Sequence, residues 1–480
     1  MADRSRSGQS QGEAAGTDQP SNDLPTAPVP EAAEGRPTET PSALRLFGTH
    51  SFFRLWLAQV VSSLGDWIGF IAVTAIAARV GGSSPEGAIS LVLAARLIPG
   101  FFLGPTAGVF VDRWDRKRLM VVCDVGRGLV LASLPLVDTI PGLFVASLLL
   151  EVLTLLWSPA KEASVPNLVR EEFLATANSL SLVAAYGTFP VGSALFAALA
   201  GVAKWLSGYE ALSGLDQESL AIYFDVVTFF VSAVMISTLA LPSQRRVHRR
   251  GKGLAVKRTF EELAEGWRFI GQSALVRSVI LGIATGLVGG GMLVPLGPVM
   301  SKQVLGGGIA GFGLLLTALG TGVAGGILAL SLLQSRVPHG RVFVLSVVGA
   351  GVCQIAGASM STLTPALVFV AGLGLCAGSV YVLGFTILQT NVEDELRGRI
   401  FSSLYTLSRF CLLLAFTVAP ILSSALDTLS ARLFERSVTV GELSVALPGV
   451  RLTLWLGGAI IVLAGLLARA AVPTRPRPSP

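Results

Sequence analysis

Three charged side chains stand inside long apolar runs of this chain, where an unpaired charge is costly. They are Asp66, Arg96 and Glu151. If each run is a helix that crosses a bilayer, a rise of about 1.5 Å per residue places all three roughly 10 to 13 Å below the same membrane face. Opposite charges at one depth neutralise each other and often bind a proton, an ion or a ligand. The other interpretation is a static buried salt bridge that joins three helices.

Carboxylates are the proton carriers that this sequence offers. None of its three histidines lies within an apolar run, so a proton-carrying site has to use Asp66 or Glu151. Burial favours the neutral form of a carboxylate, whereas a nearby cation such as Arg96 favours the charged form. A movement of Arg96 would therefore change how tightly these carboxylates hold a proton.

Other charged residues of the apolar runs have simpler interpretations. Asp124 and Arg127 are one helical turn apart, which predicts an ion pair within one helix. Asp225 is predicted near the start of its helix, where a carboxylate is favourable in any case. Arg409 lies about 13 Å into its run. It is expected either to bind an anionic group or to pair with a carboxylate, and both options remain open.

The composition indicates that a membrane surrounds these residues. The chain has 480 residues, of which 52% are hydrophobic and only 14% are charged, whereas soluble domains carry roughly 25% charged residues. Runs of about 20 apolar residues are long enough to span a bilayer as helices. We predict an all-α membrane protein with twelve transmembrane helices. The predicted limits are 52–80, 88–111, 119–137, 142–165, 175–203, 220–241, 274–301, 309–334, 341–360, 365–390, 400–426 and 448–471.

Basic residues alternate between the connecting loops and predict the orientation. Lys and Arg, with Lys161 counted among them, gather in every second loop, which places those loops and both termini in the cytoplasm. This pattern explains the net charge of +6 without nucleic-acid binding. The four cysteines lie in apolar runs without CxxC spacing, so neither a disulfide nor a metal site is expected.

The order of these runs predicts two six-helix halves between polar ends. A disordered cytoplasmic tail (1–44) contains too few large apolar residues to fold, and a short tail (473–480) closes the chain. The linker is basic and holds an amphipathic helix, which lies either at the membrane interface or against the bundle. The predicted limits are 45–241 for the N-terminal half, 242–273 for the linker and 274–472 for the C-terminal half.

In the segment Gly104–Arg118, an apolar run with regularly spaced glycines is followed by a short charged turn. Gly100, Gly104 and Gly108 recur every four residues and form a flat seam for another helix. This segment resembles the signature loop between the second and third helices of major facilitator superfamily transporters. A weaker echo without the aspartate follows in the second half, at Gln334–Arg341.

Further segments are similar to the third drug:proton antiporter group of that superfamily, which includes enterobactin exporter-like and macrolide efflux-like proteins. They are Phe53-Arg54-Leu-Trp56, Ser63-Leu-Gly65-Asp66, Arg96-Leu-Ile-Pro99, Ser158-Pro159-Ala160, Ala177-Asn178-Ser179 and Leu396-Arg397-Gly398-Arg399. The resemblance implies two pseudo-symmetric halves, alternating access and an inner gate at which Asp112 faces the start of the eleventh helix. The implied gate residues are Gly104, Gly108, Asp112, Arg113, Arg116, Arg118 and Gly398.

The resemblance also implies proton-coupled efflux of a small amphiphilic molecule such as a drug, a siderophore or a secondary metabolite. A lipid flippase, or a uniporter or importer without proton antiport, is the alternative. We expect no enzyme activity, cofactor or metal, and a monomer in a bacterial cell membrane. Aromatic residues with few charges suit an amphiphile. The candidate pocket residues are Trp67, Phe70, Trp157, Tyr186, Gln354, Tyr381 and Gln389.

Overall fold

The structure describes most of the chain between residues 47 and 471. In this computed structural model the described ranges are 47–82, 84–111, 114–170, 173–209, 216–239, 273–333, 337–392, 394–440 and 443–471. The predicted tails, 1–44 and 473–480, lie outside these ranges, and so does the predicted linker except for Ser273. Its amphipathic helix and the limits of the two halves therefore stay predictions.

The first six spans are built from seven α-helices, several of which begin at a side-chain cap. Thr49, Asp115 and Thr139 each accept a hydrogen bond from the backbone N–H three residues further on, which satisfies a donor that the first turn leaves free. Short 3₁₀ turns follow the third and fourth helices. The helices are α1 (His50–Val80), α2 (Pro85–Val111), α3 (Arg116–Ser133), α4 (Ile140–Ser164), α5 (Leu174–Tyr186), α6 (Phe189–Leu206) and α7 (Ser219–Ser237).

The last six spans follow the same pattern with one addition. Between the final two helices the chain forms an antiparallel hairpin, β1 (Ser437–Val440) and β2 (Leu443–Ala446), in which Ser437 pairs with Ala446. The sequence prediction ended the eleventh span at residue 426, whereas that helix continues to Phe434. The helices are α9 (Ala274–Gly291), α10 (Leu293–Val299) with a π-helical turn (Met300–Val304), α11 (Gly308–Leu333), α12 (His339–Ser359), α13 (Leu363–Asn391), α14 (Asp394–Phe434) and α15 (Gly449–Ala471).

The prediction of twelve membrane spans is confirmed. Within the described residues, twelve helical segments are long and apolar enough to cross a membrane. Their surfaces carry large apolar side chains such as Phe102, which is 75% exposed, and Leu332, which is 74% exposed. Such surfaces suit contact with lipid, and a helix satisfies its own backbone hydrogen bonds there.

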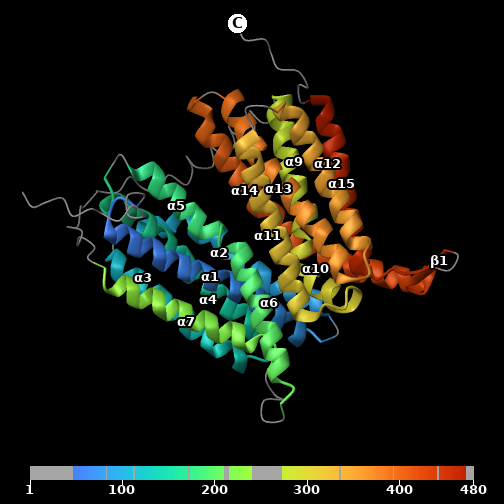
Figure 1. Cartoon of the computed structure of the whole chain (residues 1–480), viewed down its shortest axis with the longest axis horizontal. Coiled ribbons are helices and arrows are strands. Elements are labelled where there is room, and N and C mark those ends of the chain that lie inside the picture. The colour runs from blue at the N-terminus through green and yellow to red at the C-terminus, as the bar shows by residue number, and fades with distance from the viewer. Residues whose placement is uncertain are drawn as a thin grey trace, which may run out of the picture. The chain divides into compact units, whose positions relative to one another are not determined.

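Helices pack mainly with others of their own group of spans. α1 packs on α7 and α2 on α4, while α13 packs on both α11 and α12. Figure 1 shows α1–α7, coloured blue to green, lying together, and α9–α15, coloured yellow to red, lying together. Contacts between the two groups join α2 to α14, α6 to α11, and α10 to both α1 and α2.

The fifth span bends where the sequence contains glycine and proline. Helix α5 ends at Tyr186 and α6 begins at Phe189 with Pro190 in its first turn, and glycine and proline commonly bend a helix in this way. Helix α6 then packs on α11, where a Cβ on Gly313 would come within 3.0 Å of Ala197. The bent span thus joins the two groups of helices.

Glycines bring α11 and α13 into direct backbone contact. A Cβ on Gly322 would lie 2.1 Å from the carbonyl oxygen of Ala371, and a Cβ on Gly374 would lie 2.1 Å from that of Leu319. Gly326 and Gly378 repeat the arrangement one turn further along each helix. Small residues at this spacing allow close helix packing in a membrane, where the hydrophobic effect between helices is weak.

Candidate functional site

A polar cavity opens among the first six spans. It has a volume of about 610 Å³, within the range of small-molecule sites. Every residue of its lining comes from α1 to α5 or from the 3₁₀ turn after α4. The charged members of the lining are Asp66, Arg96, Arg127, Glu151, Lys161 and Glu162. Asp66, Arg96 and Glu151, placed at one depth by the sequence, are therefore brought to one cavity.

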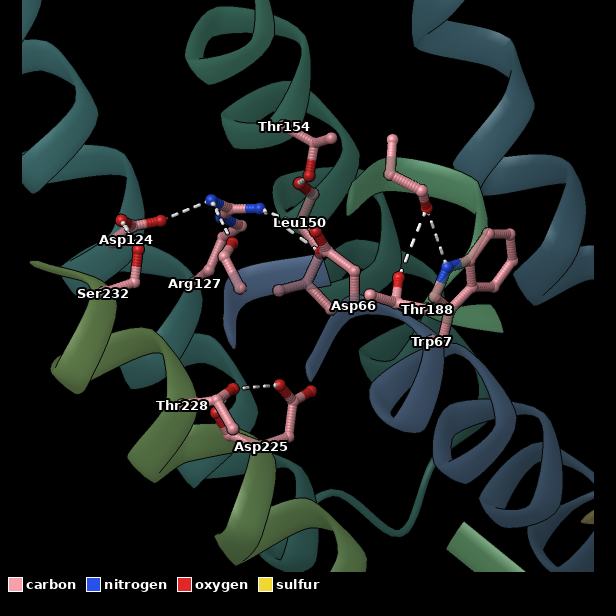
Figure 2. Close-up of polar contacts among 12 residues, drawn as sticks. Asp66, Trp67, Asp124, Arg127, Leu150, Thr154, Thr188, Asp225, Thr228 and Ser232 are labelled. Carbon is pink, nitrogen blue, oxygen red and sulfur yellow. Dashed lines mark hydrogen bonds and ion pairs between the residues drawn. The ribbon is translucent and has the colours of Figure 1, made fainter. Parts of the chain in front are cut away.

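Arg127 holds the centre of the charged network beside this cavity. Its Nη1 atom lies 3.2 Å from each carboxylate oxygen of Asp66, and its Nη2 atom pairs with Asp124 one turn earlier on α3. Ser232 of α7 donates a 2.8 Å hydrogen bond to Asp124. Figure 2 shows Arg127 between the two carboxylates. The predicted Asp124–Arg127 pair is confirmed, but the sequence did not predict that Arg127 also binds Asp66.

The two carboxylates that share Arg127 have different surroundings. Asp124 is fully buried, whereas 37% of the Asp66 side chain is exposed and Asp66 lines the cavity. The guanidinium itself is 1% exposed and lies over the rings of Trp157 and Phe229, at 5.2 and 4.4 Å from their centroids. These cation–π contacts and the two pairs fix the position of Arg127.

A further carboxylate is packed directly against α1. Asp225 is completely buried, and one of its oxygens accepts a 3.1 Å hydrogen bond from Thr228 while Oδ2 has no partner. A Cβ on Gly65 would come within 2.1 Å of Oδ1, and a Cβ on Gly69 within 2.2 Å of Oδ2. Because α7 begins at Ser219, Asp225 lies in its second turn, and its interpretation as a carboxylate favoured by the helix start is wrong.

Arg96 and Glu151 stand on the other walls of the cavity. Arg96, on α2, lies over the ring of Phe70 at 5.6 Å, and its Nε atom has no hydrogen-bond partner. Among the described residues, neither Arg96 nor Glu151 forms an ion pair within 4.0 Å. Asp66 pairs directly with Arg127 of α3. The three charges nevertheless line one cavity, and their joint role in binding a proton or substrate stays a prediction.

A cation and an indole N–H share one face of α4. Lys161 is only 6% exposed, and its Nζ atom donates a 3.2 Å hydrogen bond to Gln59 Oε1. One turn earlier, the buried Nε1 atom of Trp157 has no partner. Lys161, predicted to be one of the basic residues of a loop, lies within α4, which ends at Ser164.

Most of the predicted pocket residues meet at the cavity. Trp67, Phe70, Trp157 and Tyr186 belong to its lining. Trp67 is held by a 3.1 Å hydrogen bond to the carbonyl of Ala185 and by a tilted contact with Phe189. The other predicted pocket residues, Gln354, Tyr381 and Gln389, lie on α12 and α13 and do not belong to the described lining.

Comparison with known proteins assigns the chain to a family. Residues 41–412 match the family described as transmembrane secretion effector, which belongs to the major facilitator superfamily. The chain belongs to this family. It is a multi-pass cell membrane protein. Its fold is that of major facilitator superfamily transporters, which carry small molecules and are not enzymes.

Relatives and solved structures agree with this assignment. The chain is 24% identical over 388 residues to the MFS-type transporter YfiS of Bacillus subtilis, covering 77% of this chain and 84% of YfiS. It is 24% identical to the multidrug efflux pump Tap of Mycobacterium tuberculosis, covering 83% of this chain and 94% of Tap. The structure resembles an inward-facing bacterial homologue of the human lysosomal transporter Spinster, with a TM-score of 0.66, 14% identity and coverage of 88% and 97%.

The signature loop of this transporter is described only in part. Asp112 and Arg113 lie outside the described residues, and Gly104, Gly108 and Gly398 are described as helix backbone of α2 and α14. Arg116 donates a 2.5 Å hydrogen bond to the carbonyl of Ala163 at the end of α4. The backbone N–H of Arg118 donates to Asp115. The inner gate stays a prediction.

Arg409 joins the two groups of helices in the transporter. Its Nη1 atom donates a 3.3 Å hydrogen bond to the carbonyl of Gly100, so α14 contacts α2 at the first glycine of the predicted seam. Among the described residues this guanidinium donates to a backbone carbonyl, whereas the sequence predicted a carboxylate or an anionic ligand as its partner. Its role in substrate or proton binding stays a prediction.

Proposed function

We propose that this transporter exports small amphiphilic molecules from the cytoplasm in exchange for protons, by alternating access. The observation that carries the proposal is the unequal sharing of Arg127 between a buried and a cavity-lining carboxylate. The name of the relative Tap, a multidrug efflux pump, supports the substrate class and the direction.

Asp66 is the carboxylate that exchanges the proton. A proton on Asp66 breaks its ion pair with Arg127, yet the guanidinium keeps Asp124 as a counterion. Removing all partners of a buried charge costs about 3–5 kcal/mol, and this arrangement avoids that cost. Asp124, which is fully buried and also bonded to Ser232, stays the permanent partner.

Proton and substrate compete for the same cavity. Asp66 is followed directly by Trp67, and both belong to the lining. The aromatic wall of the cavity is formed by Trp67, Phe70, Trp157 and Tyr186. A substrate on this wall restricts access of water to Asp66 and favours the ion pair between Asp66 and Arg127. Protonation of Asp66 breaks that pair and loosens the contact between α1 and α3. Mutually exclusive binding of this kind is what antiport requires. Glu151, with Arg96 in the same lining, is the second carboxylate that adjusts this balance.

Inverted membrane vesicles provide the test. Dye, macrolide and siderophore probes are supplied outside the vesicles. Uptake is measured with an acidic vesicle interior and again without a pH difference across the membrane. We expect accumulation that needs the gradient, a loss of about 10-fold or more for Asp66→Asn, and a smaller loss for Glu151→Gln. Asp138→Asn, which changes an exposed carboxylate between α3 and α4, is the matched control and keeps wild-type transport.

Other outcomes separate the alternatives. Accumulation that is indifferent to the gradient would indicate a uniporter, and equilibration of labelled lipid between leaflets without a gradient would indicate a flippase. Wild-type coupling in Asp66→Asn would contradict the role given to that carboxylate.

A further inference from the structure

The face of α4 that lines the cavity contains a buried cation and a buried indole N–H, neither of which meets an anionic partner among the described residues. Lys161 is an ammonium group that is 94% removed from solvent, and the described residues place no carboxylate within 4.0 Å of it. Its ammonium group donates instead to the neutral amide oxygen of Gln59. Trp157, four residues earlier, adds a buried Nε1–H without any partner. Residues at this spacing share one helix face.

Neighbouring groups hold these donors in place. Gln59 donates from Nε2 to the carbonyl of Ser181 at 3.0 Å, so its Oε1 is directed toward Lys161. The Trp157 ring is fixed beneath the Arg127 guanidinium. Both residues belong to the lining of the cavity, so an acceptor that enters the cavity comes close to these two donors.

A role in membrane topology does not account for Lys161. A lysine near the end of a span normally extends its ammonium group to the interface, whereas this side chain is buried among α1 and α4 residues. A buried ammonium group without an anionic partner is unfavourable within a span, and an anionic ligand group would offset that cost.

The other charges of the lining do not occupy these donors. Asp66 is paired with Arg127, and Glu162 is exposed and forms no ion pair with Lys161 within 4.0 Å among the described residues. Glu151 lies ten residues from Lys161 on the same helix, a separation of about 15 Å along the axis.

We propose that Lys161 and Trp157 Nε1 form a subsite for one anionic group of the substrate, a carboxylate or a phosphate, while the aromatic wall holds its apolar body. This subsite rests on one part of the proposed function, namely that the substrate binds in this cavity. It narrows the substrate class to amphiphiles with an acidic group, or to lipids whose headgroup supplies the same chemistry.

Equilibrium binding without a pH gradient tests the subsite. The probes are pyrenebutanoate and pyrenebutanol, which share the aromatic body and differ in charge. The purified transporter is placed in nanodiscs of phosphatidylcholine, and energy transfer from tryptophan to pyrene reports binding. We expect wild type to prefer the carboxylate by about 10-fold or more.

Variants assign that preference to the named donors. Lys161→Met should abolish the preference while leaving pyrenebutanol binding unchanged, and Lys161→Arg should retain it. Trp157→Phe keeps the ring over which Arg127 lies and should reduce the preference about 3-fold. Lys204→Met, at an exposed lysine of α6, is the matched control and should bind both probes as wild type does.

Adding an anionic lipid to the nanodiscs distinguishes a lipid headgroup from a free substrate as the source of the anionic group. If phosphatidylglycerol added to the nanodiscs competes with pyrenebutanoate in wild type and not in Lys161→Met, the subsite takes a lipid headgroup; without competition it takes the free substrate. A wild type that does not prefer the carboxylate, or a Lys161→Met variant that keeps the preference, overturns the subsite. Neither result depends on proton-driven transport, so the proposed function stands or falls separately.

Discussion

The interiors of the first six spans and of the last six spans differ in what they bury. The first six contain Asp66, Asp124 and Arg127 in one network, together with a completely buried Asp225 that has an unsatisfied oxygen. The last six contain backbone-to-backbone glycine contacts between α11 and α13. The described cavity is lined by the first six alone.

Their buried arginines make the contrast concrete. Arg451 of α15 is 0% exposed and donates to the carbonyls of Ala358, Ala446 and Met360 and to Ser361. These are neutral acceptors at a helix end and a hairpin, so protonation cannot change them. Arg127 is held by two carboxylates, and one of them faces the cavity. A charge that titratable groups share can switch, whereas a charge held by carbonyls can only support the fold.

Exchange of these two arginines for methionine should give the largest effects and the clearest contrast. Arg127→Met leaves Asp124 buried without its cation, at a cost of about 3–5 kcal/mol, and should abolish transport. Arg451→Met leaves carbonyls unsatisfied, at a cost of about 1–3 kcal/mol, but should keep transport per folded molecule. Denaturation in a titrated detergent and vesicle transport normalised to folded protein measure both. Equal transport loss in the two variants would remove the distinction between the regions.

Alanine at the glycine contacts should have intermediate effects. In Gly322→Ala the new Cβ meets a backbone carbonyl of α13, which cannot move aside, and we expect a loss of about 3 kcal/mol. In Gly69→Ala the close contact is with a side chain, that of Asp225, while Leu131 Cδ2 lies 3.4 Å away in ordinary contact, so a loss of about 1 kcal/mol is expected. Adding Asp225→Ala should rescue Gly69→Ala in the same detergent titration. A Gly69→Ala variant that the second change does not rescue would contradict this contact.

Aromatic substitutions should give the smallest effects and test whether the cavity alone binds substrate. Trp67→Leu removes part of the lining and should weaken binding of a transported dye about 10-fold, or about 1.4 kcal/mol. Tyr381→Leu removes a ring of α13 that stacks on Phe385, 4.4 Å away, outside the described lining, and should weaken binding about 2-fold or less. Dye fluorescence titration measures both. A larger loss in Tyr381→Leu would extend the site to the last six spans, in agreement with the prediction from the sequence.

The sequence predicts the membrane-spanning helices more readily than it predicts the contacts between them. The twelve spans follow from length and hydropathy because a bilayer imposes both. Asp66, Arg96 and Glu151 were found because charges inside apolar runs are rare. Which cation Asp66 meets depends on the rotation of α1 against α3, and no local pattern fixes that rotation.

Two of the missed features had a signal in the sequence. Gly65 and Gly69 are spaced four residues apart and form a smooth face on α1, which is where Asp225 packs. The hairpin has alternating residues, Val438-Thr-Val440 and Leu443-Ser-Val445, around Gly441-Glu442. Lys161 gave no such signal, because a lysine near the end of a span usually reports topology.

Release of protons on substrate binding tests the central claim most directly. The purified transporter is mixed with a saturating transported dye in weakly buffered solution, and a pH indicator reports protons released per molecule bound. We expect about one proton from the wild type and from Asp138→Asn, and almost none from Asp66→Asn, which should still bind the dye. Wild-type proton release from Asp66→Asn would contradict the assignment of the exchanged proton to Asp66.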